Sequence, residues 1–255
     1  MNSDERALQA RQPHVALDLA SRQLKGKKIE LLLELHKRPD TIRLLEVGTG
    51  SGGIAHYFGT HSSGRFRVHA VDVVDNRLVT EGYAYSQVQD TQLPFADRSF
   101  DVVLSNHVIE HVGNESEQAK HLAELSRVMR RDAVGYLAVP NRWMLVEPHF
   151  GLIFLSWWPK SWRSAYLRLM RRGEHYDCEP LSLRETERLL DEAGFVHKNL
   201  CIEALRATVE IEKPRALAAR MVNALPDSVL AMLRPAIPTL IYRFRHAPDG
   251  TEVAG

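Results

Sequence analysis

The stretch LLEVGTGSGG at residues 44–53 decides the fold of this 255-residue chain. An apolar run ends in the acid Glu46 and then opens into alternating glycines. This pattern is typical of a buried parallel strand that leads into a helix, because glycines let the backbone turn sharply and lie close to a ligand. Glycines without such a purpose would weaken the element that contains them. The stretch therefore predicts a ligand-binding loop between a strand and a helix.

The loop also fits the dinucleotide fingerprint G-x-G-x-x-G, read from Gly48, Gly50 and Gly53. Alone, that match is weak. Glu46 stands two residues before the first glycine. A carboxylate there disfavours a pyrophosphate and favours a cofactor that carries an ammonium and a sulfonium group. The charge therefore argues against a nicotinamide dinucleotide.

Further acidic residues follow the glycine loop at the ends of apolar segments. The second predicted strand, residues 68–72, ends in Asp72, which lies 20 residues after Gly52. A carboxylate at such a strand end can accept hydrogen bonds from two ribose hydroxyls. Asp90 closes a third segment, where it could accept a hydrogen bond from an adenine amino group. A fourth strand, residues 100–106, ends at the same crevice.

These motifs, in this order, resemble a class I S-adenosylmethionine-dependent methyltransferase, in particular the small-molecule group that includes the ubiquinone and menaquinone methyltransferases. The resemblance covers residues 27–140 in motif detail and continues more loosely through residues 181–195 and the final strand. It rests on the acid and glycines of residues 46–52, on Asp72, on the runs 90–95 and 99–103, and on the Glu-His-Val of residues 110–112.

The resemblance implies an α/β fold: a Rossmann-like, seven-stranded, mostly parallel sheet with helices on both faces and a cap insertion after the fifth strand. It also implies S-adenosylmethionine as the cofactor. Glu46 and the loop glycines would hold the methionine moiety, Asp72 the ribose, Asp90 the adenine amine, and Asn106 would lie beside the methionine amino group. The full set of implied cofactor-binding residues is Glu46, Gly48, Thr49, Gly50, Gly52, Asp72, Val73, Asp90, Thr91 and Asn106.

One spacing departs from the family pattern. Only 17 residues separate Asp72 from Asp90, and residues 75–79 leave room for little more than one helical turn. We therefore expect the helix between the second and third strands to be short or absent.

The rest of the chain divides into an N-terminal arm and helix at residues 1–40, a methyltransferase domain at 41–246 with an aromatic cap at 141–180, and a disordered tail at 247–255. Residues 16–37 are expected to be helical. Asn114 or Ser116 would cap a helix that runs to Arg131, and Ser182 with Glu185 forms a capping box for a helix closed by Gly194. Further strands are predicted at residues 134–139, 197–206 and 239–244.

Composition excludes several classes of protein. A net charge of +1 creates no field that would recruit nucleic acid. The two cysteines fit neither a metal-binding nor a redox spacing, the N-terminus does not resemble a signal peptide, and no run of 18 apolar residues occurs. We therefore expect a cytoplasmic protein. The sequence does not predict an oligomeric state.

All four tryptophans lie between residues 143 and 162, in a stretch rich in arginine and lysine. In related methyltransferases the corresponding insertion covers the substrate site, so this segment is expected to shape the acceptor pocket. The tryptophans could pack inside such a lid. They could also face lipid as a peripheral membrane contact or accept a prenyl chain, since tryptophan beside basic residues is typical of interfacial segments. Contact with nucleic acid is the least favoured reading.

The sequence His107-Val108-Ile109-Glu110-His111 spells H-x-x-E-H, a metalloprotease pattern. Its position at the end of the fourth strand of a cofactor-binding fold argues against that activity. Some relatives bind a divalent metal through Glu-x-x-Glu-His at this place, but His107 replaces the first ligand, and we assign no metal here. General-base catalysis by His107 or His111 is the favoured hypothesis, with a structural role for His111 as the alternative.

Together these features predict methyl transfer to a small or lipid-linked acceptor, at an oxygen of a phenol, quinol or sugar. The alternative is a non-catalytic, cofactor-binding scaffold on the same fold.

Overall fold

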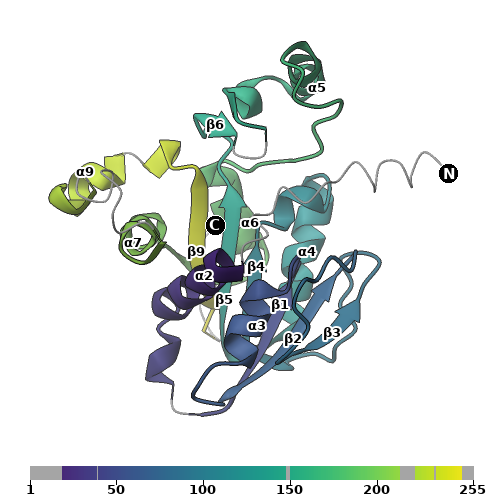
Figure 1. The fold of residues 1–255 in the computed structure, drawn as a ribbon, viewed down its shortest axis with the longest axis vertical. Coiled ribbons are helices and arrows are strands. Elements are labelled where there is room, and N and C mark those ends of the chain that lie inside the picture. Colours follow the sequence, from purple (N-terminus) through teal and green to yellow (C-terminus); the bar gives the residue numbers. More distant parts are fainter. Residues whose placement is uncertain (1–18, 39, 148–149, 213–221, 233, 249–255) are drawn as a thin grey trace.

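The computed structural model describes residues 19–38, 40–147, 150–212, 222–232 and 234–248 (Figure 1). Its centre is a seven-stranded sheet with the order β3-β2-β1-β4-β5-β9-β8. β9 runs antiparallel to both of its neighbours, and the other pairs are parallel. The strands are β1 (Ile42–Val47), β2 (Phe66–Asp72), β3 (Ala84–Gln87), β4 (Phe100–Asn106), β5 (Met129–Pro140), β8 (Phe195–Asn199) and β9 (Thr239–His246). The predicted seven-stranded, mostly parallel sheet is confirmed.

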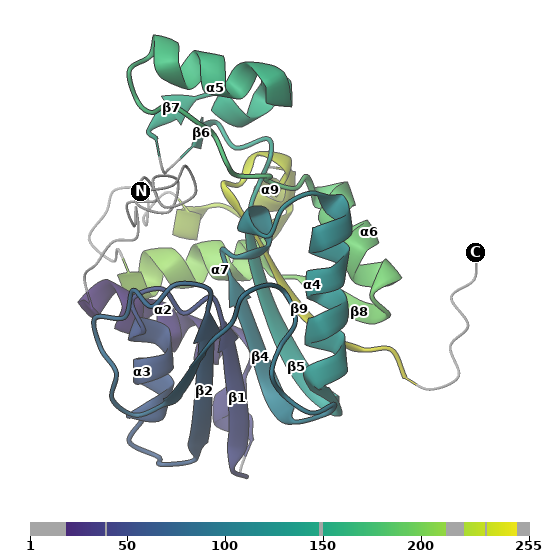
Figure 2. The ribbon, with the colours of Figure 1, turned by 90° about the vertical axis from the view of Figure 1, so that its right-hand side faces the viewer.

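Helices cover both faces of the sheet, as the views in Figures 1 and 2 show. One face carries α2 (Leu19–Leu32), α3 (Gly53–Gly59) and α7 (Cys201–Ala207), and the other carries α4 (Glu115–Val128) and α6 (Leu183–Glu192). Each layer has its own apolar core, one built around Ile29 and Phe58 and the other around Leu122 and Leu189. Burial on both sides explains why the central strands are almost continuously apolar.

The register of the parallel strands brings their carboxyl ends to one edge. Val47, at the end of β1, pairs with Val71 of β2 and with Ser105 of β4. The residues that follow these strands therefore meet above the centre of the sheet, where an open α/β fold binds its ligands.

The first predicted helix is interrupted. α2 ends at Leu32, and Glu34 adopts a left-handed conformation with φ of 56° before a short 3₁₀ turn at Leu35–Lys37. The predicted arm, residues 1–14, and the start of the predicted helix lie outside the described residues, as do the last residues of the predicted tail, 249–255.

The two predicted helix caps are present. The side chain of Asn114 accepts a hydrogen bond from the Glu117 amide at the start of α4. Ser182 and Glu185 form the reciprocal capping box of α6, and Gly194 beyond its end has a φ of 79°. α4 stops at Val128 and does not reach Arg131, because Met129 already pairs with Phe100 in the sheet.

The strand predicted at residues 197–206 is wrong in its second half. β8 ends at Asn199, whose side chain accepts a hydrogen bond from the Cys201 amide at 3.1 Å and turns the chain. α7 begins there and continues into a π-helical turn at Thr208–Glu212. Leu200 and Ala204, four residues apart, are buried against the α2 layer, and this packing selects a helix. Beyond it, α9 (Asp227–Met232) and a 3₁₀ turn (Arg234–Ala236) precede β9.

No helix lies between β2 and β3, as expected from the short spacing. The connection returns instead along the glycine loop, where the Leu78 amide donates to the Ser51 carbonyl at 3.0 Å. Gly82 then packs directly against Gly59 at the end of α3, so closely that a side chain on Gly59 would overlap the Gly82 carbonyl. The backbone of this loop thus replaces the missing helix.

The insertion after β5 forms a small cap beyond the carboxyl edge of the sheet (Figure 2). It contains the hairpin of β6 (Val146–Glu147) and β7 (Leu152–Ile153), a 3₁₀ turn (Leu155–Trp157) and α5 (Lys160–Leu169). Its two ends meet at a bridge between Asn141 and Leu181. Across the described part of the chain, every helix is too short or too polar to span a bilayer.

Candidate active site

The glycine loop lies between the end of β1 and the start of α3. The Gly48 amide donates to the Val71 carbonyl at 2.8 Å, and the Gly50 amide donates to Oδ2 of Asp72 at 2.7 Å. Gly50 has a φ of 55°, and a Cβ atom at this position would meet nothing within 4 Å. These two hydrogen bonds attach the loop to β2. The space beside the Cα atom of Gly50 is open to a ligand.

Gly52 is required for a different reason. Its φ is 79°, and a side chain there would overlap the Tyr83 hydroxyl and the Val79 carbonyl. A glycine at this position lets the connection between β2 and β3 pack directly on the loop.

Glu46 is 2% exposed beneath the loop. Its Oε2 accepts hydrogen bonds from the Thr49 hydroxyl at 2.7 Å and from the Ala55 amide at 3.0 Å. Burial raises the pKa of Glu46 to about 8, although these two hydrogen bonds and the positive charge of Arg22 oppose the shift. The carboxyl group is therefore poised to ionise when a cation arrives beside it.

Asp72 ends β2, and backbone amides hold both of its oxygens. Gly50 donates to Oδ2, and Val73 donates to Oδ1 at 2.8 Å. The Val74 amide also donates to Oδ1, at 3.5 Å. A carboxylate has about four acceptor positions, so one remains, on Oδ2, for a hydroxyl group of a ligand. The side chain of Val73 is 45% exposed beside it.

Asp90 and Thr91 lie in the loop after β3. Asp90 is exposed, and its Oδ1 accepts a hydrogen bond from the Gln92 amide at 2.8 Å. The rest of this loop is held by Arg127 of α4, which donates to the carbonyls of Leu93 at 3.0 Å and Phe95 at 2.7 Å.

Asn106 ends β4 and is 9% exposed. The next residue, His107, adopts a left-handed conformation with φ of 59°, which is uncommon for a residue with a side chain. Its amide still donates to the Ala138 carbonyl of β5 at 2.9 Å. The turn directs the Val108 side chain onto Gly48, where a Cβ atom would overlap it.

His107 is paired with a buried acid. Its Nδ1 lies 3.2 Å from Oε1 of Glu110, which is fully buried, whereas the His107 side chain is 27% exposed. Oε2 of Glu110 has no hydrogen-bond partner within the described chain. The pair therefore fixes one nitrogen of the imidazole ring and leaves Nε2 for other partners.

The structure separates His111 from His107. Nδ1 of His111 lies 3.8 Å from Sγ of Cys178 in the cap, and Asp177 is the third member of this group. These ligand atoms lie within 4.8 Å of one another, and they form the one cluster of potential metal ligands found in the described residues. Burial raises the pKa of the Cys178 thiol far above its usual range. Since a thiol binds metals as the thiolate, a metal here would have to displace this proton.

The sequence did not predict the roles of three residues at this site: Arg22 and Arg127 were not candidates, and Glu110 was named only within the H-x-x-E-H and Glu-His-Val patterns. Arg22 of α2 lies across the start of α3, where a side chain on Gly53 would overlap it, and its charge acts on Glu46. Arg127 holds the loop after β3, and Glu110 holds His107. Arg22 and Arg127 carry no local signal, because each acts through a contact with a distant segment.

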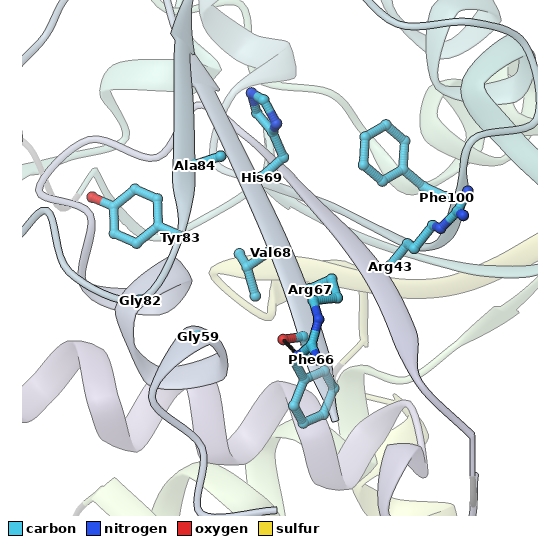
Figure 3. Close-up of a pocket in the computed structure, with 10 residues that line it drawn as sticks. All are labelled: Arg43, Gly59, Phe66, Arg67, Val68, His69, Gly82, Tyr83, Ala84 and Phe100. Carbon is cyan, nitrogen blue, oxygen red and sulfur yellow. Dashed lines mark hydrogen bonds between the residues drawn. The ribbon is translucent and has the colours of Figure 1, made fainter. Parts of the chain in front are cut away.

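A shallow cavity of about 600 Å³ lies away from these residues (Figure 3). It lies beside Phe66–His69, the early part of β2, where β3 is too short to cover the strand because its pairing begins at His69. The carboxyl ends of β1 and β2 lie at the opposite end of these strands, so this cavity is separate from the glycine loop.

Comparison with known proteins assigns the fold and the domain. Residues 45–137 match a family model described as a methyltransferase domain. A search of curated proteins gave no match.

Solved structures with the same fold include three whose sequences are only distantly similar. The YcgJ protein of Bacillus subtilis has a TM-score of 0.50 and 15% identity, with 87% of this chain and 99% of that one covered. A SAM-dependent methyltransferase of Methanosarcina mazei has a TM-score of 0.50 and 16% identity over 84% and 98% of the two chains. The [4+2]-cyclase SpnF has a TM-score of 0.51 and 13% identity over 88% and 81%.

The matched segment runs from β1 to β5 and includes the glycine loop, Asp72, Asp90 and the end of β4. Residues 45–137 therefore match a methyltransferase domain, and the chain has the fold of these solved structures, one of which is a SAM-dependent methyltransferase.

Proposed function

We propose that this enzyme transfers a methyl group from S-adenosylmethionine to an oxygen of a small or lipid-linked acceptor, either a phenol or quinol or a sugar. The observation that carries this proposal is the pair of His107 and Glu110 at the end of β4, next to a glycine loop that is open above Gly50. A hydroxyl acceptor must lose its proton as the methyl group arrives, and a positioned histidine performs this step near neutral pH.

The residues around the loop fit the chemical groups of the cofactor. The methionine moiety carries an ammonium and a carboxylate. We assign the ammonium to Glu46 and Asn106. We assign the carboxylate to Arg22, whose positive charge acts on Glu46 and whose Cβ and Cγ atoms lie over Gly53 at the start of α3. The open backbone of Gly50 would let the cofactor lie on the loop, while Gly48, Thr49 and Gly52 give the loop its shape.

The nucleoside would extend towards β2 and β3. The remaining acceptor position on Oδ2 of Asp72 suits the ribose hydroxyls, with Val73 against the sugar and adenine. Asp90 would accept a hydrogen bond from the adenine amine through Oδ2, because its Oδ1 already accepts one from the Gln92 amide. Thr91 would contact the adenine beside it.

The bound cofactor supplies an electrophilic methyl group on a positively charged sulfonium. The protein's share of the work is position and proton transfer. Glu110 would hold Nδ1 of His107, and Nε2 of His107 would take the acceptor's proton. His111 is the second candidate base, but its contact with Cys178 directs it towards the cap.

The cap, which extends from the end of β5 beside this site, supports the proposed acceptor class. Its surface carries exposed tryptophans at positions 143, 157, 158 and 162, which suit an apolar or isoprenoid-bearing molecule. A sugar on a polyprenyl carrier would meet the same surface.

A direct assay tests the proposal in two stages. Calorimetric titration with S-adenosylmethionine and S-adenosylhomocysteine, with NAD as the control, should give micromolar binding to the first two only. Transfer of a labelled methyl group should then be measured on a panel of isoprenoid quinols, simple phenols and lipid-linked sugars. Cofactor binding without transfer to any member would contradict the acceptor classes proposed.

The second candidate is a scaffold that binds the cofactor without transferring the methyl group. The structural likeness to a [4+2]-cyclase favours keeping it, because this fold also supports a protein named for a different reaction. Tight cofactor binding, together with no transfer and no cofactor hydrolysis over the whole panel, would support it.

A further inference from the structure

The four tryptophans of the cap lie outside its core. The cap is packed around Leu152, Leu155 and Leu167 with Tyr176 and Cys178. The tryptophans are instead exposed, at 42% for Trp143, 45% for Trp157, 41% for Trp158 and 60% for Trp162. The expectation that they fill the inside of a lid is therefore wrong.

These side chains form two aromatic clusters that adjoin one another. Trp157 contacts Trp143, with ring centres 5.6 Å apart, and Phe154, with centres 4.8 Å apart. Trp158 stacks on Trp162, with centres 5.8 Å apart and an interplanar angle of 12°. Trp157 and Trp158 are consecutive in the chain, and we call the two clusters together the aromatic surface.

Helix α5 extends this surface. Trp162 and Leu169, the latter 77% exposed, are seven residues apart and share one side of the helix. The opposite side, Arg163 and Leu167, is buried. Arg163 is held inside the cap, where its Nε donates to the Trp158 carbonyl at 2.9 Å. The outward side chains are therefore not needed to hold the cap together.

The exposed charges of α5 and of the turn after it are basic, although Lys160 is paired with Glu179 at the end of the cap. Between residues 143 and 172 the sequence has one acid, Glu147. Glu147 is fully buried and accepts a hydrogen bond from the Phe150 amide at 2.8 Å. The exposed charged residues of this stretch are all basic: Lys160, Arg168, Arg171 and Arg172.

We propose that the aromatic surface docks on an anionic lipid bilayer, with its tryptophans among the headgroups and its arginines on lipid phosphates. Soluble proteins rarely expose a large contiguous apolar patch without a partner. Tryptophan with arginine and lysine is the composition that suits the membrane interface. Vesicle binding is measured without cofactor or acceptor, so failure of docking and failure of the proposed reaction can be told apart.

A second copy of the chain suits this surface less well. A two-fold dimer brings the same patch of each copy together. It would therefore place Arg168, Arg171 and Arg172 of one copy near the same basic residues of the other. A surface of anionic lipid complements these charges, each of which contributes about 1 kcal/mol near a membrane, or roughly fivefold in affinity.

The position of all four tryptophans in the cap gives a specific measurement. The full chain should be titrated with vesicles of phosphatidylcholine alone and of phosphatidylcholine mixed with phosphatidylglycerol, and its intrinsic fluorescence recorded. We expect a blue shift and quenching by brominated lipid with the anionic vesicles. Binding should weaken as salt is added. Flotation of the same mixtures gives the partition coefficient independently.

Two pairs of substitutions test the two components. Trp162→Ala with Leu169→Ala should lower the partition coefficient at least tenfold. The control is Leu31→Ala with Met232→Ala, which changes exposed side chains away from the cap (47% and 80% exposed) and should leave the coefficient unchanged. Arg171→Gln with Arg172→Gln should lower it roughly 25-fold, at about fivefold per charge. The control is Lys27→Gln with Arg184→Gln, two exposed basic residues on α2 and α6.

Several results would overturn the proposal. One is the absence of both flotation and a fluorescence shift with anionic vesicles. Another is equal loss of binding in the cap variants and their controls. A third is a dimer in sedimentation equilibrium that Trp162→Ala dissociates, without vesicle binding by the wild type. Binding of a single-stranded oligonucleotide in place of vesicles would assign the surface to nucleic acid.

Discussion

The backbone amide of Gly50 donates to the carboxylate of Asp72 at 2.7 Å, which joins the glycine loop to the end of β2. The loop's left-handed glycine and the strand's last side chain therefore form one unit. A ligand that binds the carboxylate also meets the open backbone of Gly50. This bond holds the glycine loop and an acid 22 residues later in one place.

Replacement of Asp72 should remove cofactor binding while the protein stays folded. In Asp72→Ala the ribose loses its acceptor and the Gly50 amide loses its partner, so we expect affinity for S-adenosylhomocysteine to fall at least about 100-fold, since hydrogen bonds to charged groups contribute about 1.5–3 kcal/mol each. Calorimetry measures the affinity, and a thermal melt checks the fold. The matched control is Asp75→Asn, three residues further along, whose acid pairs with Arg77 at 2.8 Å. Normal affinity in Asp72→Ala would contradict the assignment of Asp72 to the ribose.

Glu46 should make the stability of the cofactor-free protein depend on pH. Its pKa is about 8 in the fold because burial disfavours the carboxylate, and about 4.3 in an unfolded chain. The folded state therefore holds an extra proton between these values. This contribution to the free energy of unfolding is complete below about pH 4 and is lost as pH rises through about 8, by roughly 1.4 kcal/mol per pH unit.

The substitution Glu46→Gln should remove this loss of stability with rising pH, because glutamine does not ionise. We expect the difference in Tm between the variant and the wild type to widen from about pH 5 to about pH 8, in favour of the variant. Glu81→Gln, an exposed residue, is the control and should show a constant difference. A constant difference for Glu46→Gln as well would mean that the buried carboxyl is already ionised.

The same carboxyl should couple cofactor binding to proton release. An ammonium beside Glu46 favours the carboxylate, which the free protein lacks below about pH 8. Affinity should therefore rise between about pH 6 and pH 8, by up to about tenfold per pH unit. Calorimetry in two buffers of different ionisation enthalpy should detect the released proton in the wild type and not in Glu46→Gln. Equal proton release in both proteins would assign it to another group.

The parts of this site that the sequence could predict depend on local constraints. A run of glycines with an acid at the end of an apolar strand indicates a loop that needs left-handed backbone, and Gly48, Gly50 and Gly52 all adopt it. Asp72 and Asn106 likewise end apolar segments. Parallel strands bring such ends to one edge, so their proximity followed from the fold class.

The parts that the sequence could not predict depend on distant contacts. β8 stops at Asn199 because its side chain turns the chain and because Leu200 and Ala204 find a buried surface on α2. The exposure of the cap tryptophans could not be predicted either. An apolar residue looks the same in the sequence whether the protein core or a binding partner covers it. Arg127 is another example, because its bonds reach a loop about 32 residues earlier.

Loss of Arg127 should weaken both the fold and the adenine side of the site. Its guanidinium donates to two carbonyls of the loop after β3 and pairs with Glu124, which itself accepts from the Leu93 amide at 2.9 Å. We expect Arg127→Gln to lower the free energy of unfolding by about 1–3 kcal/mol. Affinity for the cofactor should fall further than for Arg130→Gln, whose surface pair with Asp101 at 3.3 Å lies near the start of β4. Chemical denaturation and calorimetry measure the two effects, and unchanged affinity would show that the loop does not depend on this contact.

The pair of His107 and Glu110 predicts a separation between binding and turnover. His107→Gln should lower kcat by about 10²–10⁴-fold on the first acceptor identified, because the general base is lost, and should leave cofactor affinity unchanged. Glu110→Leu should lower kcat as a positioning defect, and Glu110→Gln should restore part of it, since an amide oxygen can still accept from Nδ1. His36→Gln, on an exposed turn, is the control. A purely structural role for Glu110 would lower Tm and cofactor affinity together in both Glu110 variants. Full turnover in His107→Gln, with loss in His111→Gln, would move the base to His111 and make its contact with Cys178 at 3.8 Å part of the acceptor site.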